Sequence, residues 1–197
     1  AYITCIIVSY KRIHTHNIMP QIRPIFPKFI YTEDLNLSDA YNNEIKQEVM
    51  KILKSADTRG EYSITNFGVD STNQTLNNPT FAPLFAMIRE NIEQLRKMIN
   101  HTVPLRITNV WLSITPPGKY HDVHKHLSTP VAGVYYVQSS PSMHLNFIYD
   151  GSLQGNDNHI EPIAPKKLIL FDGSLLHGFT HVNINEEPKI TIAFNCQ

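Results

Sequence analysis

From Leu105 to the C-terminus, the sequence is a succession of short runs of β-branched and aromatic residues separated by turn-forming residues. Strands that follow one another without intervening helices pair antiparallel, in a sandwich or a barrel. This part of the chain, about residues 105–197, therefore predicts a jelly roll. The expected strands are Leu105–Ile114, Val131–Val137, His144–Tyr149, His159–Ile163, Lys167–Phe171 and Ile190–Asn195.

The preceding part, about residues 32–104, predicts helices. Apolar residues recur at helical spacing over Asp39–Lys54, and Ser38 is a suitable N-cap for this helix. A second helix is expected after Asn78 and Pro79, which are typical of a helix start. Helices followed by strands indicate an α+β protein in which N-terminal helices buttress the jelly roll. The second helix carries a stripe of apolar residues that is expected to pack in the core: Phe81, Phe85, Ile88, Ile92, Leu95 and Ile99.

A chain of 197 residues is long enough for one domain with a sizeable core. Residues 1–18 fit this domain poorly and are expected to form an N-terminal extension. The domain is then expected to cover residues 19–197, with Met19 as a candidate alternative start. Prolines give an edge character to a strand that is expected over Ile22–Tyr31.

The composition narrows the expected partners and location. Lys plus Arg number 17, as do Asp plus Glu, so a net charge of zero gives no reason to expect binding to nucleic acid or a membrane surface. No apolar run is long enough to span a membrane. Cys5 and Cys196 are the only cysteines, too few for a disulfide framework, so the reducing cytoplasm is the expected location.

Potential metal ligands crowd into the stretch that follows a turn-forming Pro-Pro-Gly sequence. Side chains at i and i+2 of a strand share a face, so His124 and His126 can point together at one metal ion. Imidazole nitrogen suits iron, zinc, copper or nickel. His177, which follows a later strand, is the expected ligand from elsewhere in the chain. Asp122, two residues before His124 and therefore on the same face of a strand, is the alternative to His126. Other histidines are expected to be surface groups or to support the ligands: His14, His16, His121, His144, His159 and His181.

A second group of residues can meet an anionic ligand. Lys189 begins the last expected strand, where a cation can bind the far carboxylate of a small diacid held by the metal. Tyr135 and Tyr136 point to opposite faces of their strand, and Tyr136 is a candidate hydrogen-bond donor to the ligand. Asn146, on the next strand, is a similar candidate.

A series of short motifs occurs in a fixed order along the chain. These are S-x-x-x-F/W-G-x-x-S (Ser63, Gly68, Ser71), a strand with Trp111, H-x-H (His124, His126) before G-V-Y-Y (Gly133–Tyr136), L-x-L-F-x-x-x-x-x-H (Leu168–His177) and Ala-Phe-Asn (Ala193–Asn195). In order and spacing they resemble the phage and bacterial family of 2-oxoglutarate-Fe(II) oxygenases, over roughly two-thirds of the chain.

The resemblance implies a double-stranded β-helix and an enzyme that uses Fe(II), 2-oxoglutarate and O2. Such enzymes convert 2-oxoglutarate to succinate and CO2 and hydroxylate a C–H bond of a second substrate; prolyl hydroxylases are distant relatives, and ascorbate is a candidate reductant. His124 and His177 would bind iron with His126 as the third ligand, and Lys189 would take the place of the usual Arg. If the protein is phage-encoded, the host cytoplasm is its expected location.

The primary substrate is not specified by these motifs. Loops around a site carry specificity, and the polar segments Glu61–Pro79 and Gly151–Asn158 are expected to be loops at its mouth.

The sequence departs from the family pattern at positions that bear on activity. His126 stands where the family has a carboxylate, so the metal would keep more net positive charge and hold an anionic co-substrate more tightly. Lys189 offers a point charge where Arg would bind a carboxylate with two hydrogen bonds. Leu127 replaces the usual Pro after H-x-H, and Asp172-Gly173 replaces a Pro-Ser pair.

Two other functions fit the same residues. Gly118, with five residues between it and His124, matches the opening of the first cupin motif, and a cupin-type enzyme would share the jelly roll without using 2-oxoglutarate. A module that binds metal or ligand without chemistry fits the missing carboxylate and the missing Arg.

Overall fold

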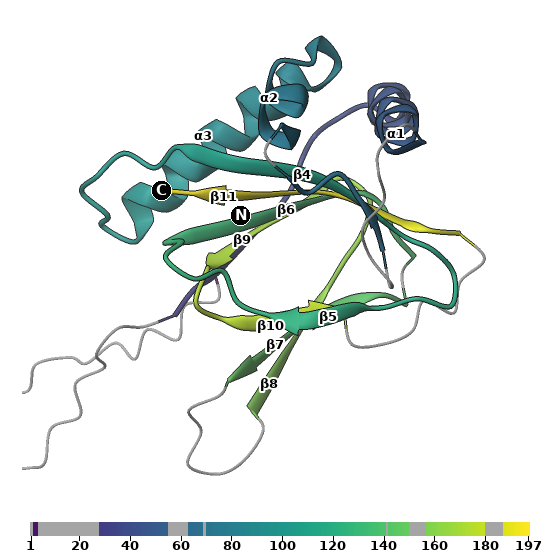
Figure 1. Cartoon of the computed structure of the whole chain (residues 1–197). Helices are drawn as coiled ribbons and strands as arrows, with labels where there is room; N and C mark the ends of the chain where they lie inside the picture. Colours follow the sequence, from purple (N-terminus) through teal and green to yellow (C-terminus); the bar gives the residue numbers. More distant parts are fainter. Residues whose placement is uncertain are drawn as a thin grey trace, which may run out of the picture.

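The computed structural model describes residues 2–3, 28–54, 63–68, 70–140, 142–149, 157–179 and 187–197. Its core is a pair of antiparallel sheets that face each other, with the helices on the outer side of the larger sheet (Figure 1). The larger sheet has the order β1-β2-β9-β6-β11-β4-β3 and the smaller sheet has the order β5-β10-β7-β8. This is the double-stranded β-helix expected from the sequence, in the predicted α+β arrangement.

The strands of the larger sheet come from the whole length of the chain. They are β1 (Tyr2–Ile3), β2 (Ile30–Asp34), β3 (Ile64–Thr65), β4 (Ile107–Thr115), β6 (Val131–Gln138), β9 (Lys167–Asp172) and β11 (Lys189–Cys196). The strands of the smaller sheet are β5 (His121–His124), β7 (His144–Tyr149), β8 (Asp157–Pro162) and β10 (Leu176–Phe179).

The helices begin where the sequence places caps. In α1 (Asp39–Lys54), the Ser38 hydroxyl accepts a hydrogen bond from the Tyr41 amide at 3.1 Å. A 3₁₀ turn at Pro79–Phe81 leads into α3 (Ala82–Met98), and the Asn78 side chain accepts from the Thr80 amide at 2.9 Å. Both long helices therefore occur as predicted, with their apolar faces packed on the larger sheet.

The last strand, β11, shows how the two layers are held together. Alternate side chains of a strand point to opposite faces. Ile190, Ile192 and Phe194 pack in the core beneath the helices, whereas Lys189 and Thr191 line a pocket between the sheets. The helices thus stabilise one face of the strand that presents site residues on the other.

The six strands predicted from Leu105 onward are all present, with ends that differ by a few residues. The expected loop Glu61–Pro79 is wrong in part, because it contains β3 and the six-residue helix α2 (Ser71–Leu76). The sequence gives no sign of α2, because the side chains that this helix buries are the polar Ser71 and Thr75 and not apolar residues at helical spacing. The strand expected over Ile22–Tyr31 is described only from Lys28, and its β2 part begins at Ile30.

Three other expectations fall wholly or partly outside the described residues. Tyr2–Ile3, within the expected extension 1–18, pairs antiparallel with β2, while residues 4–27 are not described. The expected loop Gly151–Asn158 is described only at its last two residues, which belong to β8. Cys5 also lies outside, and Cys196 is a buried free thiol whose pKa is raised to about 12 by burial. Among the described residues, no helix has the length and apolar character needed to cross a membrane.

Gly133, in the middle of β6, leaves room for side chains of the two neighbouring strands to pack over it. A Cβ at this position would lie 2.2 Å from the ring of Phe194 and 2.8 Å from Leu170 Cδ2. These distances are shorter than any van der Waals contact, so the sheet face accepts no side chain here.

We therefore expect Gly133→Ala to lower the free energy of unfolding by about 1–3 kcal/mol, the usual cost of overpacking a core. Urea unfolding followed by circular dichroism measures this change. Gly68→Ala is the matched control, because the nearest atom to its added Cβ is 3.9 Å away. Equal stability of the two variants would contradict the packing described here.

Candidate metal centre

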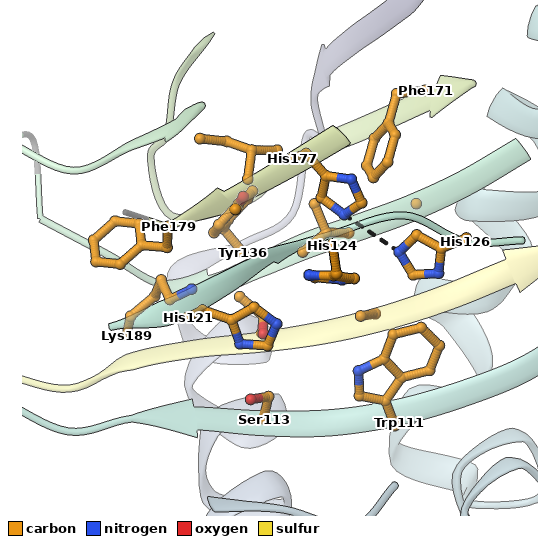
Figure 2. A pocket seen from close by; sticks show the side chains of 16 residues that line it. Trp111, Ser113, His121, His124, His126, Tyr136, Phe171, His177, Phe179 and Lys189 are labelled. Atoms are coloured by element: carbon orange, nitrogen blue, oxygen red, sulfur yellow. Dashed lines mark hydrogen bonds between the residues drawn. The ribbon is translucent and has the colours of Figure 1, made fainter. Parts of the chain in front are cut away.

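Three histidines converge at one end of the pocket between the sheets. One ring nitrogen from each of His124, His126 and His177 lies within 4.8 Å of the others, and Nε2 of His126 is 3.3 Å from Nε2 of His177. Strand pairing explains this, because His124 at the end of β5 is directly opposite His177 in β10. His126 follows two residues later, and its amide donates to the Gly173 carbonyl at 2.8 Å. The dashed line in Figure 2 marks the close approach of the His126 and His177 rings.

The backbone fixes the tautomer of two of these rings. Nδ1 of His124 lies 2.8 Å from the Asp122 carbonyl, and Nδ1 of His177 lies 2.8 Å from the Leu175 carbonyl. A carbonyl oxygen only accepts hydrogen bonds, so Nδ1 carries the proton in both rings. Nε2 then offers its lone pair to the centre of the cluster, which is the arrangement that metal-binding histidines usually have.

Burial keeps the rings of His126 and His177 neutral. Burial, helped by the neighbouring His124 and His126, lowers the pKa of His177 to about 3, and the hydrogen bond to Leu175 opposes the shift. Burial and His124 likewise lower the pKa of His126 to about 4, opposed by Asn195. Neutral imidazole is the form that binds metals, and three imidazole nitrogens at these separations fit a divalent transition metal such as Fe(II).

A β-bulge changes which residues of β5 face the pocket. Opposite the pair His177–His124, the next pair is Phe179–His121, so two residues of β5 lie against Gly178 alone. His121 therefore lines the pocket together with His124, although their spacing would place them on opposite faces of a regular strand. Their ring centroids are 5.0 Å apart.

The bulge corrects one expectation from the sequence and makes a second one more specific. Asp122 is exposed and is not part of the histidine cluster, so the alternation that made it an alternative ligand does not apply. His121, expected to be a surface or supporting group, is a pocket residue. Gly178 makes the bulge possible, because a Cβ there would lie 2.9 Å from Cα of Val123 and 3.0 Å from the Asp122 carbonyl oxygen.

The other end of the pocket holds a buried cation. The side chain of Lys189 is buried, and its Nζ lies 4.5 Å from the centroid of the Phe179 ring. Burial lowers the pKa of Lys189 to about 8. Among the described residues it has no ion pair, so a ligand that brings a negative charge would be stabilised here. Hydroxyl groups of Ser113 and Thr191 line the same pocket.

The two adjacent tyrosines separate as predicted. Tyr136 lines the pocket, whereas the Tyr135 hydroxyl donates to the Asn42 side chain at 2.7 Å on the helical side. The Tyr136 hydroxyl is buried, which raises its pKa, so it is a neutral donor. Asn146 is buried in β7, but its neighbour Leu145 lines the pocket in its place.

Aromatic side chains surround the histidine end. Trp111 lies over the His126 ring at 5.9 Å between centroids, and Phe67 packs edge-on against Trp111 at 5.3 Å. Phe67 and Leu127 are both exposed, so the cluster continues to the surface. Phe67 belongs to the segment that was expected to form part of the mouth. Phe67 occupies the F/W position of the first motif, whereas Ser113 and Thr191 have no sequence signal of their own.

No protein-family model and no curated protein matches the sequence. Solved structures do match in fold. A prolyl-4-hydroxylase from Pseudomonas putida is 11% identical with a TM-score of 0.60, over 85% of this chain and 91% of that one. HygX from Streptomyces hygroscopicus, solved with nickel, 2-oxoglutarate and hygromycin B, is 14% identical with a TM-score of 0.62, over 85% and 82%. The 2-oxoglutarate-dependent carbocyclase SnoK from nogalamycin biosynthesis is 9% identical with a TM-score of 0.63, over 85% and 78%.

These similarities define the class of fold. The chain has the double-stranded β-helix that is shared by non-haem 2-oxoglutarate oxygenases, as the sequence motifs predicted.

Metal binding by the histidine cluster can be tested directly. We expect His124→Ala and His177→Ala each to lower the affinity for Ni(II) or anaerobic Fe(II) by roughly 100-fold or more, because losing even a supporting residue costs 10–100-fold. Calorimetry measures the affinity. His159→Ala, an exposed histidine of β8, is the control and should bind as tightly as the unaltered protein. Unchanged binding by the two site variants would exclude this cluster.

The low pKa values also predict acid sensitivity of the metal-free protein. His177 has a pKa of about 3 when folded and about 6.5 when unfolded, so the unfolded state binds the extra proton and stability falls as the pH drops below about 6.5. Between pH 7 and pH 5, this residue alone should cost about 2 kcal/mol. Urea unfolding at both pH values should show a smaller loss for His177→Asn than for the unaltered protein. An equal loss would contradict a neutral buried His177.

Proposed function

We propose that this protein is an Fe(II)- and 2-oxoglutarate-dependent oxygenase. One observation supports the proposal above others: a single pocket has a cluster of neutral metal-ligating nitrogens at one end and a buried cation without an ion pair among the described residues at the other. A diacid with a chelating end and a distal carboxylate matches both ends. A metal site and a cation site for a 2-oxo diacid, together in this fold, are what the proposed oxygenase reaction requires.

His124, His126 and His177 would hold the iron. When bound, Fe(II) would be chelated by the 2-oxo acid and would supply the site at which O2 is activated. The protein contributes fixed lone pairs, because the backbone carbonyls hold the Nδ1 protons of His124 and His177. Three neutral ligands leave the full charge of the ion uncompensated, so the site favours an anionic co-substrate more than a site with a carboxylate ligand would.

Lys189 would bind the distal carboxylate. Its ammonium is buried over the Phe179 ring, where no water shell weakens its attraction for a negative charge. Ser113 and Thr191 can donate hydrogen bonds to the same group, and the Tyr136 hydroxyl is a further donor. Asn146 remains a candidate only from the sequence.

Hydroxylation of a C–H bond is the reaction that the motifs favour. The fold alone does not specify it, since SnoK is a carbocyclase. The exposed Phe67 lies next to Trp111 at the histidine end, so a substrate would reach the metal past aromatic side chains. The use of ascorbate and a cytoplasmic location remain predictions.

A binding module without chemistry is the second candidate. His126 supports it, because an imidazole replaces the anionic ligand that the related enzymes normally have. A cupin-type enzyme is less favoured, since it would have no need for the buried charge of Lys189.

The test is turnover of the co-substrate. With Fe(II), ascorbate and air, the protein should convert 2-oxoglutarate to succinate and CO2, slowly without a primary substrate. Lys189→Ala should raise the KM for 2-oxoglutarate by roughly 10- to 100-fold, the value of a hydrogen bond to a charged group, and leave Fe(II) affinity unchanged. Lys54→Ala, on the exposed side of α1, is the control. Binding of metal and 2-oxoglutarate without any succinate, even with candidate substrates, would favour the module.

A further inference from the structure

His121 is the one histidine of the pocket that the metal cluster does not use. It lies between the two ends of the pocket, next to the ring of His124 on one side and toward Lys189 on the other (Figure 2). Its nitrogens are not among those that come within 4.8 Å of one another in the cluster. Its position needs the bulge opposite Gly178, so the fold directs it inward.

On one side, the ring of His121 lies toward the cationic end of the pocket (Figure 2). His121 is the pairing partner of Phe179, and Phe179 is the ring over which the Lys189 ammonium lies at 4.5 Å. The charge of Lys189 also lowers the pKa of His121, and only burial lowers it more. His121 on β5 and Lys189 on β11 thus come to Phe179 from different sheets, the first as its strand partner and the second over its ring.

His121 has hydrogen-bonding capacity to spare. Both ring nitrogens of His124 and His177 have assigned roles, with Nδ1 on a carbonyl and Nε2 toward the metal. The ring of His121 makes no hydrogen bond with any described residue, although it is largely withdrawn from solvent. A partly buried N–H without a partner is costly unless a ligand satisfies it.

We propose that His121 is a co-substrate-binding residue that donates a hydrogen bond to the distal carboxylate held by Lys189, and that it thereby selects dicarboxylic over monocarboxylic 2-oxo acids. This inference rests on the proposed function for the identity of the ligand. A neutral donor suits this position, because Lys189 already supplies the positive charge that the carboxylate needs. The ammonium and the ring N–H approach from opposite sheets, so together they fix the length of the diacid.

The test uses binding rather than turnover. The intact protein is loaded with Ni(II) under nitrogen and titrated calorimetrically with 2-oxoglutarate and, separately, with pyruvate, which has no distal carboxylate. His121→Phe keeps a planar ring without the N–H and should weaken 2-oxoglutarate by roughly 10- to 100-fold. Its affinities for Ni(II) and for pyruvate should stay unchanged. His121→Gln retains a donor and should recover part of the loss, and His159→Phe is the surface control.

Several results would overturn the inference. An unchanged affinity of His121→Phe for 2-oxoglutarate would remove His121 from the ligand. An equal loss for pyruvate would move its role to the chelating end, and a loss of Ni(II) affinity would make it a metal ligand.

A measurement on the unaltered protein covers the case in which His121→Phe fails to fold. In the ¹⁵N-histidine NMR spectrum of a Zn(II)-loaded sample, 2-oxoglutarate should shift one imidazole N–H that His121→Gln lacks, and pyruvate should not. No such shift would contradict the inference.

The outcomes also separate this inference from the proposed function. If 2-oxoglutarate binds through His121 but no succinate forms, the oxygenase proposal fails and the role of His121 stands. If succinate forms and His121→Phe binds normally, the reverse holds.

Discussion

The site depends on the close pairing of two short strands, β5 and β10. His124 meets His177 only because these strands lie side by side, and the pairing is close enough to require a residue without a side chain at Gly178. The same contact produces the bulge that directs His121 inward. One short stretch of backbone thus determines the direction of three imidazoles. Because this stretch belongs to the smaller sheet, the helices that pack on the larger sheet stabilise the fold without touching these ligands.

Charge is distributed unusually along the pocket. Its described lining residues include four histidines and a lysine but no carboxylate. Burial holds His121, His126 and His177 neutral, whereas Lys189 contributes a positive charge before any metal binds. A metal ion would add two more positive charges within the same cavity. Such a pocket attracts anions strongly, and a dianionic 2-oxo acid neutralises much of that charge in one step.

Much of this arrangement could be predicted from the sequence. His124, His126 and His177 follow from strand periodicity and from motif spacing, and the caps at Ser38 and Asn78 place both long helices. The errors share a physical cause, because they concern features that depend on contacts between distant segments. The bulge in β5 is created by β10 and reverses the inward and outward directions of neighbouring side chains. The helix α2 is equally hidden, since it buries small polar side chains against β4 and not an apolar stripe.

The stacking of Trp111 on His126 has a practical consequence. Trp111 is the single tryptophan of the chain, and its ring centroid lies 5.9 Å from that of a proposed metal ligand. Its indole emission therefore arises beside the metal centre, without background from any other tryptophan. A bound metal ion with an open d shell quenches this fluorescence. A ligand that displaces Phe67 changes the polarity around the indole ring and therefore shifts its emission. The protein carries its own optical label for occupancy of the pocket.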